Sequence, residues 1–170
     1  MIQPTRAIVV LLVIIVTSGV AAAHARIPQA TGNKACGLVT ESELQVALGA
    51  KVTLKPGSIG DVQTCAGETA TARVLVRFFT RKDQSGNAEQ AGIDAIKKMG
   101  AQVDVKTSGG IMCMTAVPPQ NLAAMGFGTT CTVTSKAPMF AVIEVTAKTQ
   151  KDMVPMERLR AVAEKMATRF

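Results

Sequence analysis

Four cysteines are the residues of this chain best suited to covalent or metal chemistry: Cys36, Cys65, Cys113 and Cys131. An even number of cysteines in a chain outside the cytosol indicates disulfide bonds. Three pairings are possible, and we expect Cys36–Cys65 and Cys113–Cys131, because neighbours in sequence close short loops within each half of the chain. Zinc is the competing use, but its sites need ligands as close as C-x-x-C, and no two of these cysteines are so near each other.

Two methionines, Met112 and Met114, offer a different chemistry, because thioether sulfurs bind Cu(I). As a strand, "IMCMT" places both methionines on one face and Cys113 on the other. The chain has nine methionines but no Trp or Tyr, so methionine is also needed to fill gaps in the core. We expect no metal or other cofactor, and keep copper handling through these methionines as the alternative function.

The first 25 residues have the layout of a secretory signal peptide. A short segment with Arg6 precedes the apolar run 7–16, and small residues follow, with cleavage expected after Ala23 or Ala25. An uncleaved anchor is the other interpretation, but the apolar stretch is barely long enough to span a bilayer. No cysteine lies near the cleavage site, so a lipid anchor is not indicated.

The single histidine, His24, restricts catalysis. Cleavage after Ala25 removes it, and a Ser-His-Asp or Cys-His site then cannot be built in the usual way. Cleavage after Ala23 makes it the N-terminal residue, where it could bind copper, although a copper brace needs a second histidine. No G-x-S-x-G, S-x-x-K or P-loop motif is present. A hydrolase-type enzyme without histidine therefore ranks third among the functions considered.

Residues 26–170 are expected to form one exported domain, periplasmic or secreted, without a transmembrane segment and with an ordered core from about residue 35 to residue 170. The net charge is +7, or +6 once Arg6 is removed with the leader. Basic residues are spread without a dense run and stacking aromatics are nearly absent, so nucleic acid is not expected as a partner. An envelope protein or an anionic surface is the kind of partner that remains.

The elements that hold these residues begin with a short helix predicted over 41–48. Thr40 and Glu43 form a capping box, and Val39 and Leu44 occupy the positions of a hydrophobic staple. Gly49 supplies a left-handed residue that ends the helix. A helix of about two turns does not persist alone. We therefore expect the Cys36–Cys65 bridge to hold it against the early strands.

Most of the remaining chain reads as strands and turns. Strands are predicted at 51–54, 62–67, 72–81, 102–107, 111–117, 129–135 and 139–148. Loops are expected at 56–60 and, with a helical turn, at 118–128. In 72–81 one face carries Val74, Val76 and Phe78, and a partly wet face carries Arg73, Leu75, Arg77, Phe79 and Arg81.

Two longer helices are predicted over 88–100 and 155–170. Ile96 and Met99 are core candidates of the first helix. The second has an apolar stripe at spacings of three and four residues: Met156, Leu159, Val162, Ala163, Met166 and Phe170. Runs of strands with few long crossovers imply an α+β domain, with an antiparallel sheet of about six to seven strands, packed by two or three helices and stapled by two disulfides.

The segments "CGLVTESELQVALGAKV" and "APMFAVIEVTAKT…MERLRAVAEKMATRF", with Cys65 between them, resemble a broad family of small bacterial exported proteins, many of them lipoproteins of unknown function. Members start with a cysteine, a Leu-Thr-x-x-Glu helix and an Ala-Leu-Gly stop, and end in a strand and an Ala-rich helix. This chain departs from them by lacking the lipid-attachment cysteine and by adding Cys113 and Cys131. The resemblance implies an envelope location and an α+β fold, but no activity.

Together these observations predict a non-catalytic exported envelope protein that serves as a binding or interaction module for a ligand the sequence does not identify.

Overall fold

The computed structural model of the protein describes residues 32–80, 87–135 and 138–170. The predicted signal peptide, with His24, lies outside the described residues. The strands are β1 (Lys55–Ile59), β2 (Val62–Glu68), β3 (Ala72–Thr80), β4 (Gln102–Ser108), β5 (Ile111–Val117), β6 (Phe127–Thr134) and β7 (Met139–Ala147). The helices are α1 (Lys34–Gly37), α2 (Glu41–Leu48), α3 (Asn87–Lys98) and α4 (Met156–Ala167), with 3-10 turns η1 (Gln120–Met125) and η2 (Gln150–Asp152).

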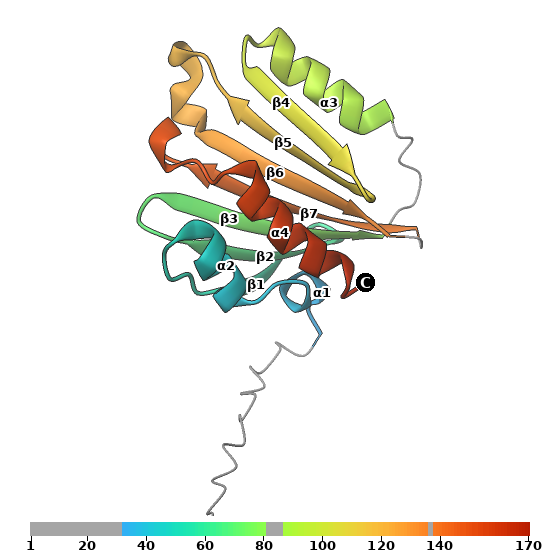
Figure 1. The fold of residues 1–170 in the computed structure, drawn as a ribbon. Coiled ribbons are helices and arrows are strands. Elements are labelled where there is room, and N and C mark those ends of the chain that lie inside the picture. Colours follow the sequence, from blue (N-terminus) through green and yellow to red (C-terminus); the bar gives the residue numbers. More distant parts are fainter. Residues whose placement is uncertain (1–31, 81–86, 136–137) are drawn as a thin grey trace, which may run out of the picture.

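The seven strands form one sheet in the order β1-β2-β3-β7-β6-β5-β4, and all neighbouring strands are antiparallel (Figure 1). Strands β1 to β3 make one meander and β4 to β7 another, and the two meanders meet at the central β3–β7 pair. The predicted α+β class, the antiparallel sheet and both disulfides are therefore confirmed.

The two faces of the sheet are covered differently. Helices α1, α2 and α4 pack on one face, here called the α4 face, and Figure 1 shows α4 crossing it. Helix α3 lies beside the edge strand β4 and packs toward the other face, here called the α3 face, because Ile96 lines a pocket with Met114 of β5. Met114 points away from α4, since its neighbour Cys113 is buried in the core under that helix.

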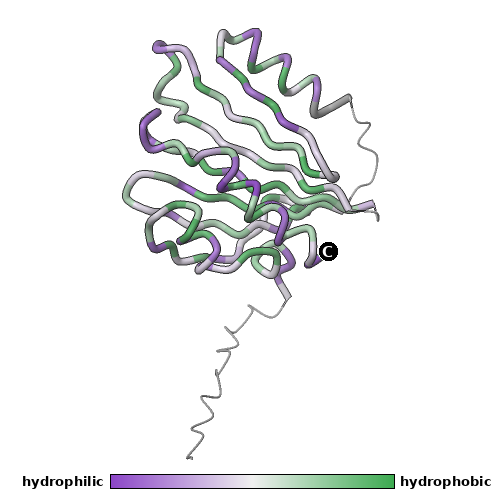
Figure 2. Tube along the Cα trace, viewed as in Figure 1, coloured by the Kyte–Doolittle hydropathy of each residue, from purple (hydrophilic) through white to green (hydrophobic). Residues whose placement is uncertain are grey.

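The main core lies between the sheet and α4. Alternate residues of the central strands point into it and are at most 1% exposed: Val74, Val76, Ile143 and Val145. Burying such a side chain contributes about 1.5–3 kcal/mol. The predicted stripe of α4 completes the core, and Figure 2 shows hydrophobic segments running along the central strands. Thr129 Oγ1 donates to the carbonyl of Val154 at 2.7 Å and so fixes the start of α4 on β6.

The N-terminal unit forms as predicted. Thr40 Oγ1 accepts from the Glu43 backbone N–H at 3.2 Å, and the Thr40 N–H donates to Glu43 Oε2 at 3.0 Å, which completes the capping box. Gly49 ends α2 with a φ of 69°. One helical turn, α1, precedes α2 and was not predicted; Asn33 caps it by accepting from the Cys36 N–H.

The first strand differs from the prediction. We expected a strand at 51–54 and a loop at 56–60, whereas 51–54 has no regular structure and β1 occupies Lys55–Ile59. Val52 is nevertheless buried, so packing rather than strand pairing fixes that segment. Pro56 is tolerated in β1 because this strand is at the sheet edge and pairs only with β2.

The core assignment of Met99 is also wrong. Helix α3 ends at Lys98, so Met99 follows the last helical turn and is 49% exposed. Within 90–98, the part of α3 whose side chains the structure describes, Ile93 is buried, at 5% exposed, and Ile96 is half-buried. The predicted helical turn within 118–128 is confirmed as η1, and β6 pairs with β7 as predicted.

Candidate functional site

Both predicted disulfides are present. Cys36 of α1 is bonded to Cys65 of β2, and Cys113 of β5 to Cys131 of β6, which stand directly opposite each other. Cys65, Cys113 and Cys131 have no exposed surface, and the described part of the chain has no free cysteine. The cysteines are therefore structural, and they indicate folding in an oxidising compartment.

The methionines singled out by the sequence do not form one site. Met112 and Met114 share the α3 face of β5, as predicted, but only Met114 lines a pocket. Two other methionines line the same pocket: Met99, after α3, and Met125, at the end of η1. Met125 is 64% exposed, so these side chains are not all buried as core filling.

The pocket with Met114 lies on the α3 face between α3, η1 and the strands. Its volume is about 290 Å³, close to the lower end of the range for small-molecule sites. Most of its lining is apolar: Ile96, Met99, Ala101, Met114, Ala116, Pro118, Pro119, Leu122 and Met125. We call it the apolar pocket.

An ion pair lies on the floor of the apolar pocket. Arg77 Nη2 of β3 donates to Glu144 Oε2 of β7 at 2.7 Å, and each side chain is about one third exposed. Thr146 Oγ1 donates to the other oxygen of Glu144 at 3.3 Å. The Nε of Arg77 is buried and has no hydrogen-bond partner in the part of the chain that the structure describes. Buried polar atoms without partners are rare, and they often mark sites where a ligand or water completes the bonding.

Two glycines shape this pocket for different reasons. Gly126 has a φ of 86°, and a Cβ there would collide with Thr146 Cγ2, so no other residue fits without a shift. Gly128, two residues later in β6, has ordinary backbone angles, and a Cβ there would meet no atom within 4 Å. Glycine weakens a strand interior and often marks the close approach of a ligand or another backbone. The backbone of β6 does not require glycine at position 128, and the lack of a side chain there leaves open space in the pocket.

A second pocket, here called the polar pocket, adjoins the first. It lies between the end of the β2–β3 hairpin and η1, and its volume is about 560 Å³. Its lining includes four charged residues: Glu68, Arg73, Glu144 and Lys148. Met125, Gly126, Glu144 and Thr146 line both pockets. The two pockets together form one groove across the α3 face, which we call the sheet groove.

Sequence reasoning did not find the sheet groove. The partly wet face of β3 was anticipated from its arginines, and Arg77 lies on it. The segment 118–128 was predicted only as a connection, although η1 makes the wall of both pockets. One feature of the sequence could have indicated the pocket wall. The segment expected to be a loop carries several apolar residues: Pro118, Pro119, Leu122 and Met125.

No group of three His, Cys, Asp or Glu side chains lies close enough to hold a metal ion among the described residues. Within those residues no helix has the length and apolar character needed to cross a bilayer.

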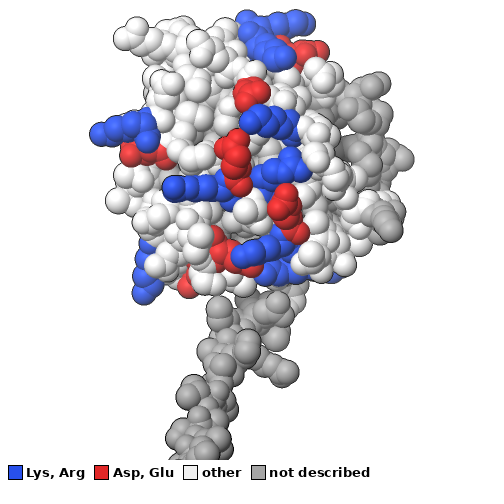
Figure 3. Space-filling model, in the orientation of Figure 1, with Lys and Arg blue, Asp and Glu red and all other residues white. Residues whose placement is uncertain are grey.

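On the side of the molecule that carries α4, acidic and basic side chains are intermixed without a large area of one sign (Figure 3).

No protein-family model, curated protein or solved structure matches this chain.

Proposed function

We propose that the protein is a non-catalytic, exported binding module and that its ligand occupies the sheet groove. The observation that carries this proposal is the apolar pocket itself. It is a concave surface of about 290 Å³ with apolar walls and a few polar groups on its floor. That combination is the usual character of small-molecule sites.

The methionines support an adaptable apolar ligand. Their unbranched side chains adjust to different shapes and are frequent on binding surfaces that accept several partners. Met99 follows α3, Met114 lies in β5 and Met125 ends η1, so the three methionines reach the pocket from different parts of the chain. Met99 and Met125 are also exposed at 49% and 64%, and a bound apolar group would remove this surface from water.

The exported location is part of the proposal. Its support is the pair of disulfides, which persist outside the cytosol, together with the leader that the sequence predicts over residues 1–25. We place the mature protein in the periplasm or the medium, in keeping with the family that the sequence resembles. Fractionation after expression of the full chain in a bacterium tests this, and an intact Met1 in the membrane fraction would indicate an anchor instead.

Binding is tested with the apolar fluorescent probe phenylnaphthylamine on the oxidised protein. We expect a saturable rise in emission. The variant Gly128→Leu fills the groove from its floor, where a new side chain meets no atom at its Cβ. Its affinity for the probe should fall at least about tenfold, which corresponds to about 1.4 kcal/mol.

The matched control is Gly37→Leu. This glycine of α1 also has open space around an added Cβ, but it lies on the α4 side of the sheet and outside the groove. Probe affinity should be unchanged in this variant. Absence of saturable binding to the wild-type protein, or an equal loss in both variants, would contradict the proposal.

Copper handling is the second candidate, and one observation favours it. Three thioether side chains, those of Met99, Met114 and Met125, line the same pocket, and such ligands prefer Cu(I). The apolar ligand ranks first because the pocket wall also contains proline, leucine and isoleucine side chains that a metal site does not need.

A further inference from the structure

We infer that the ligand of the sheet groove is an amphipathic carboxylate, whose acyl chain lies in the apolar pocket and whose carboxylate binds Lys148 in the polar pocket. This inference rests on the proposed function, since it specifies the ligand of the same groove.

The two pockets are continuous along β7. Glu144 and Thr146 line both of them, and Lys148, the first residue after β7, also lines the polar pocket. Lys148 is four positions after Glu144, which in an extended chain corresponds to about 13 Å. An elongated molecule can therefore lie along β7 with one end in the apolar pocket and the other beside the Lys148 ammonium.

The charges of the groove leave one cation without a carboxylate. Arg73 Nη2 pairs with Glu68 Oε1 at 2.9 Å, and Arg77 pairs with Glu144 at 2.7 Å. Lys148 Nζ donates to the backbone carbonyl of Ala70 at 2.7 Å, and among the described residues no carboxylate pairs with it. An ammonium group has three donors, so Lys148 retains donors for a ligand.

This arrangement favours a singly charged anion. Three cations and two carboxylates give the groove a net charge of +1. A monocarboxylate neutralises that charge, whereas a phosphate monoester would bring close to two negative charges beside Glu68 and Glu144. A neutral apolar ligand would gain no charge interaction from Lys148, because the free donors of this exposed ammonium would stay bound to water. Charge complementarity and the apolar pocket thus point to the same class of ligand from opposite ends of the groove.

The test compares decanoate with decanol, which share an apolar chain and differ in the charge of the head group. Each displaces phenylnaphthylamine from the oxidised protein at neutral pH and low salt. We expect decanoate to bind at least about fivefold more tightly than decanol, the size of effect that one partly exposed charge pair supplies. Higher salt should reduce that preference.

Three variants identify the residue responsible. Lys148→Gln keeps a donor for the Ala70 carbonyl but removes the charge, so decanoate affinity should fall to that of decanol while decanol affinity is unchanged. Lys148→Arg should keep the preference. Lys51→Gln, at an exposed lysine outside both pockets, should change neither affinity.

The outcomes separate this inference from the proposed function. Equal affinities of the wild-type protein for decanoate and decanol, or an equal loss of both in Lys148→Gln, would overturn the carboxylate assignment while leaving an apolar binding site. Failure of the probe itself to bind would overturn both proposals.

Discussion

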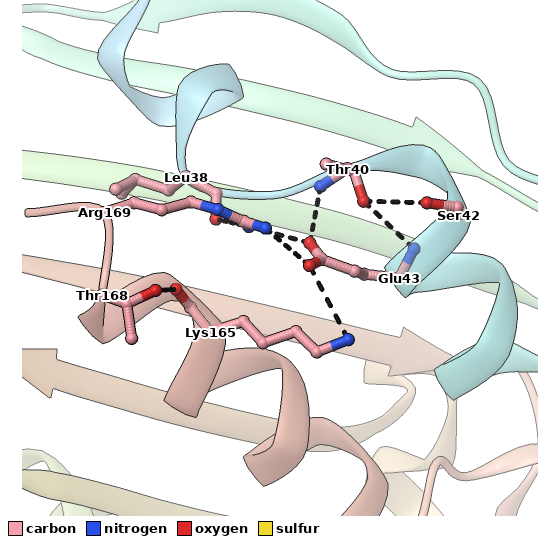
Figure 4. Close-up of polar contacts among 7 residues, drawn as sticks. All are labelled: Leu38, Thr40, Ser42, Glu43, Lys165, Thr168 and Arg169. Atoms are coloured by element: carbon pink, nitrogen blue, oxygen red, sulfur yellow. Dashed lines mark hydrogen bonds and ion pairs between the residues drawn. The ribbon is translucent and has the colours of Figure 1, made fainter. Parts of the chain in front are cut away.

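Arg169 follows the end of α4 by two residues, and its Nη2 lies 2.6 Å from Oε1 of Glu43 in α2 (Figure 4). Arg169 Nη1 donates to the second oxygen of Glu43 at 2.8 Å and to the Leu38 carbonyl at 2.7 Å. The guanidinium therefore binds both carboxylate oxygens, the strongest geometry for such a pair. Because Glu43 also caps α2 through Thr40, one carboxylate joins the N-terminal unit to the end of the chain.

The environment of Glu43 determines how this contact responds to pH. Burial raises the pKa of the Glu43 carboxyl, but hydrogen bonds from Arg169 and from the Thr40 backbone lower it by more, so the net pKa is below its ordinary value. A carboxyl group whose pKa is lower in the folded state than in the unfolded state stabilises the fold when it is ionised. This stabilisation is fully present above the pKa of the unfolded state, about 4.3, and is lost as the pH falls through the pKa of the folded state.

Replacing Glu43 with Gln should lower the free energy of unfolding by about 1–3 kcal/mol at neutral pH, the usual contribution of hydrogen bonds to a charged group. Urea unfolding at neutral pH and near pH 3 measures the difference between variant and wild type. The difference should shrink at the lower pH, because the unfolded state takes up a proton below about 4.3 that Glu43 in the folded state resists.

The control is Glu164→Gln, which removes the exposed partner of Arg160 in α4, where the glutamate side chain is 57% exposed. Its effect should stay within about 0.5 kcal/mol. An effect of Glu43→Gln that does not change between the two pH values would argue against an ionic contribution from this pair.

Replacing Cys36 and Cys65 with Ser should lower the free energy of unfolding by about 2–5 kcal/mol, the usual loss for a native bridge in a small secreted domain. The bridge closes a separation of 29 residues and ties α1 to β2, beside the short helix α2. Amide exchange should accelerate first in α1 and α2 if the variant remains folded. Uniform acceleration throughout the sheet would show instead that the bridge stabilises the whole domain equally.

The sequence predicted those features of the fold that depend on residues close together in the chain. The capping box of Thr40 and Glu43 and the stop at Gly49 are decided by backbone hydrogen bonds and φ angles inside one helix. The alternation in β3 and the stripe of α4 are decided by which side faces the core. Pairing each cysteine with its neighbour in sequence was correct, because α1, which carries Cys36, packs on β2, which carries Cys65, and because Cys113 and Cys131 stand opposite each other in β5 and β6.

The groove was not predictable from such signals because residues far apart in sequence build it. Arg77 and Glu144, on adjacent strands, are separated by 67 residues, and Met99 reaches the same pocket from the end of α3. The strand at 51–54 was mispredicted for a related reason. Val52 packs into the core without being part of a strand, so its apolar side chain suggested a strand that does not form. The strand lies in the next segment, β1, where Pro56 is tolerated because β1 is at the edge of the sheet.

Replacing Met99, Met114 and Met125 together with Leu separates the two candidate functions, because these three methionines line the apolar pocket. Volume-conserving swaps cost under about 1.5 kcal/mol each, so the variant should remain folded. Because leucine keeps the pocket apolar, binding of phenylnaphthylamine should persist. Competition with the chelator bicinchoninate measures Cu(I) affinity, and we expect no stoichiometric Cu(I) binding before or after the change. Tight one-to-one binding in the wild type that disappears in the variant would place copper handling first.

Replacing Gly126 or Gly128 of the groove with Ala should change the free energy of unfolding differently at the two positions. Gly126→Ala should lower the free energy of unfolding by about 1–3 kcal/mol, because a side chain at a φ of 86° is strained and its Cβ would collide with Thr146. Gly128→Ala should leave stability unchanged or raise it by up to about 1 kcal/mol, because alanine loses less backbone entropy in a strand and meets open space here.

Urea unfolding of both glycine variants measures these stabilities, and phenylnaphthylamine titration measures the groove. A single methyl group at Gly128 should reduce probe affinity less than Gly128→Leu does, since it fills less of the space above the strand. Gly126→Ala displaces Thr146 and the end of η1, which line both pockets, so it should weaken binding as well as stability. A marked loss of stability in Gly128→Ala would mean that the space above this residue is filled in the folded protein, and the sheet groove would then lose its floor.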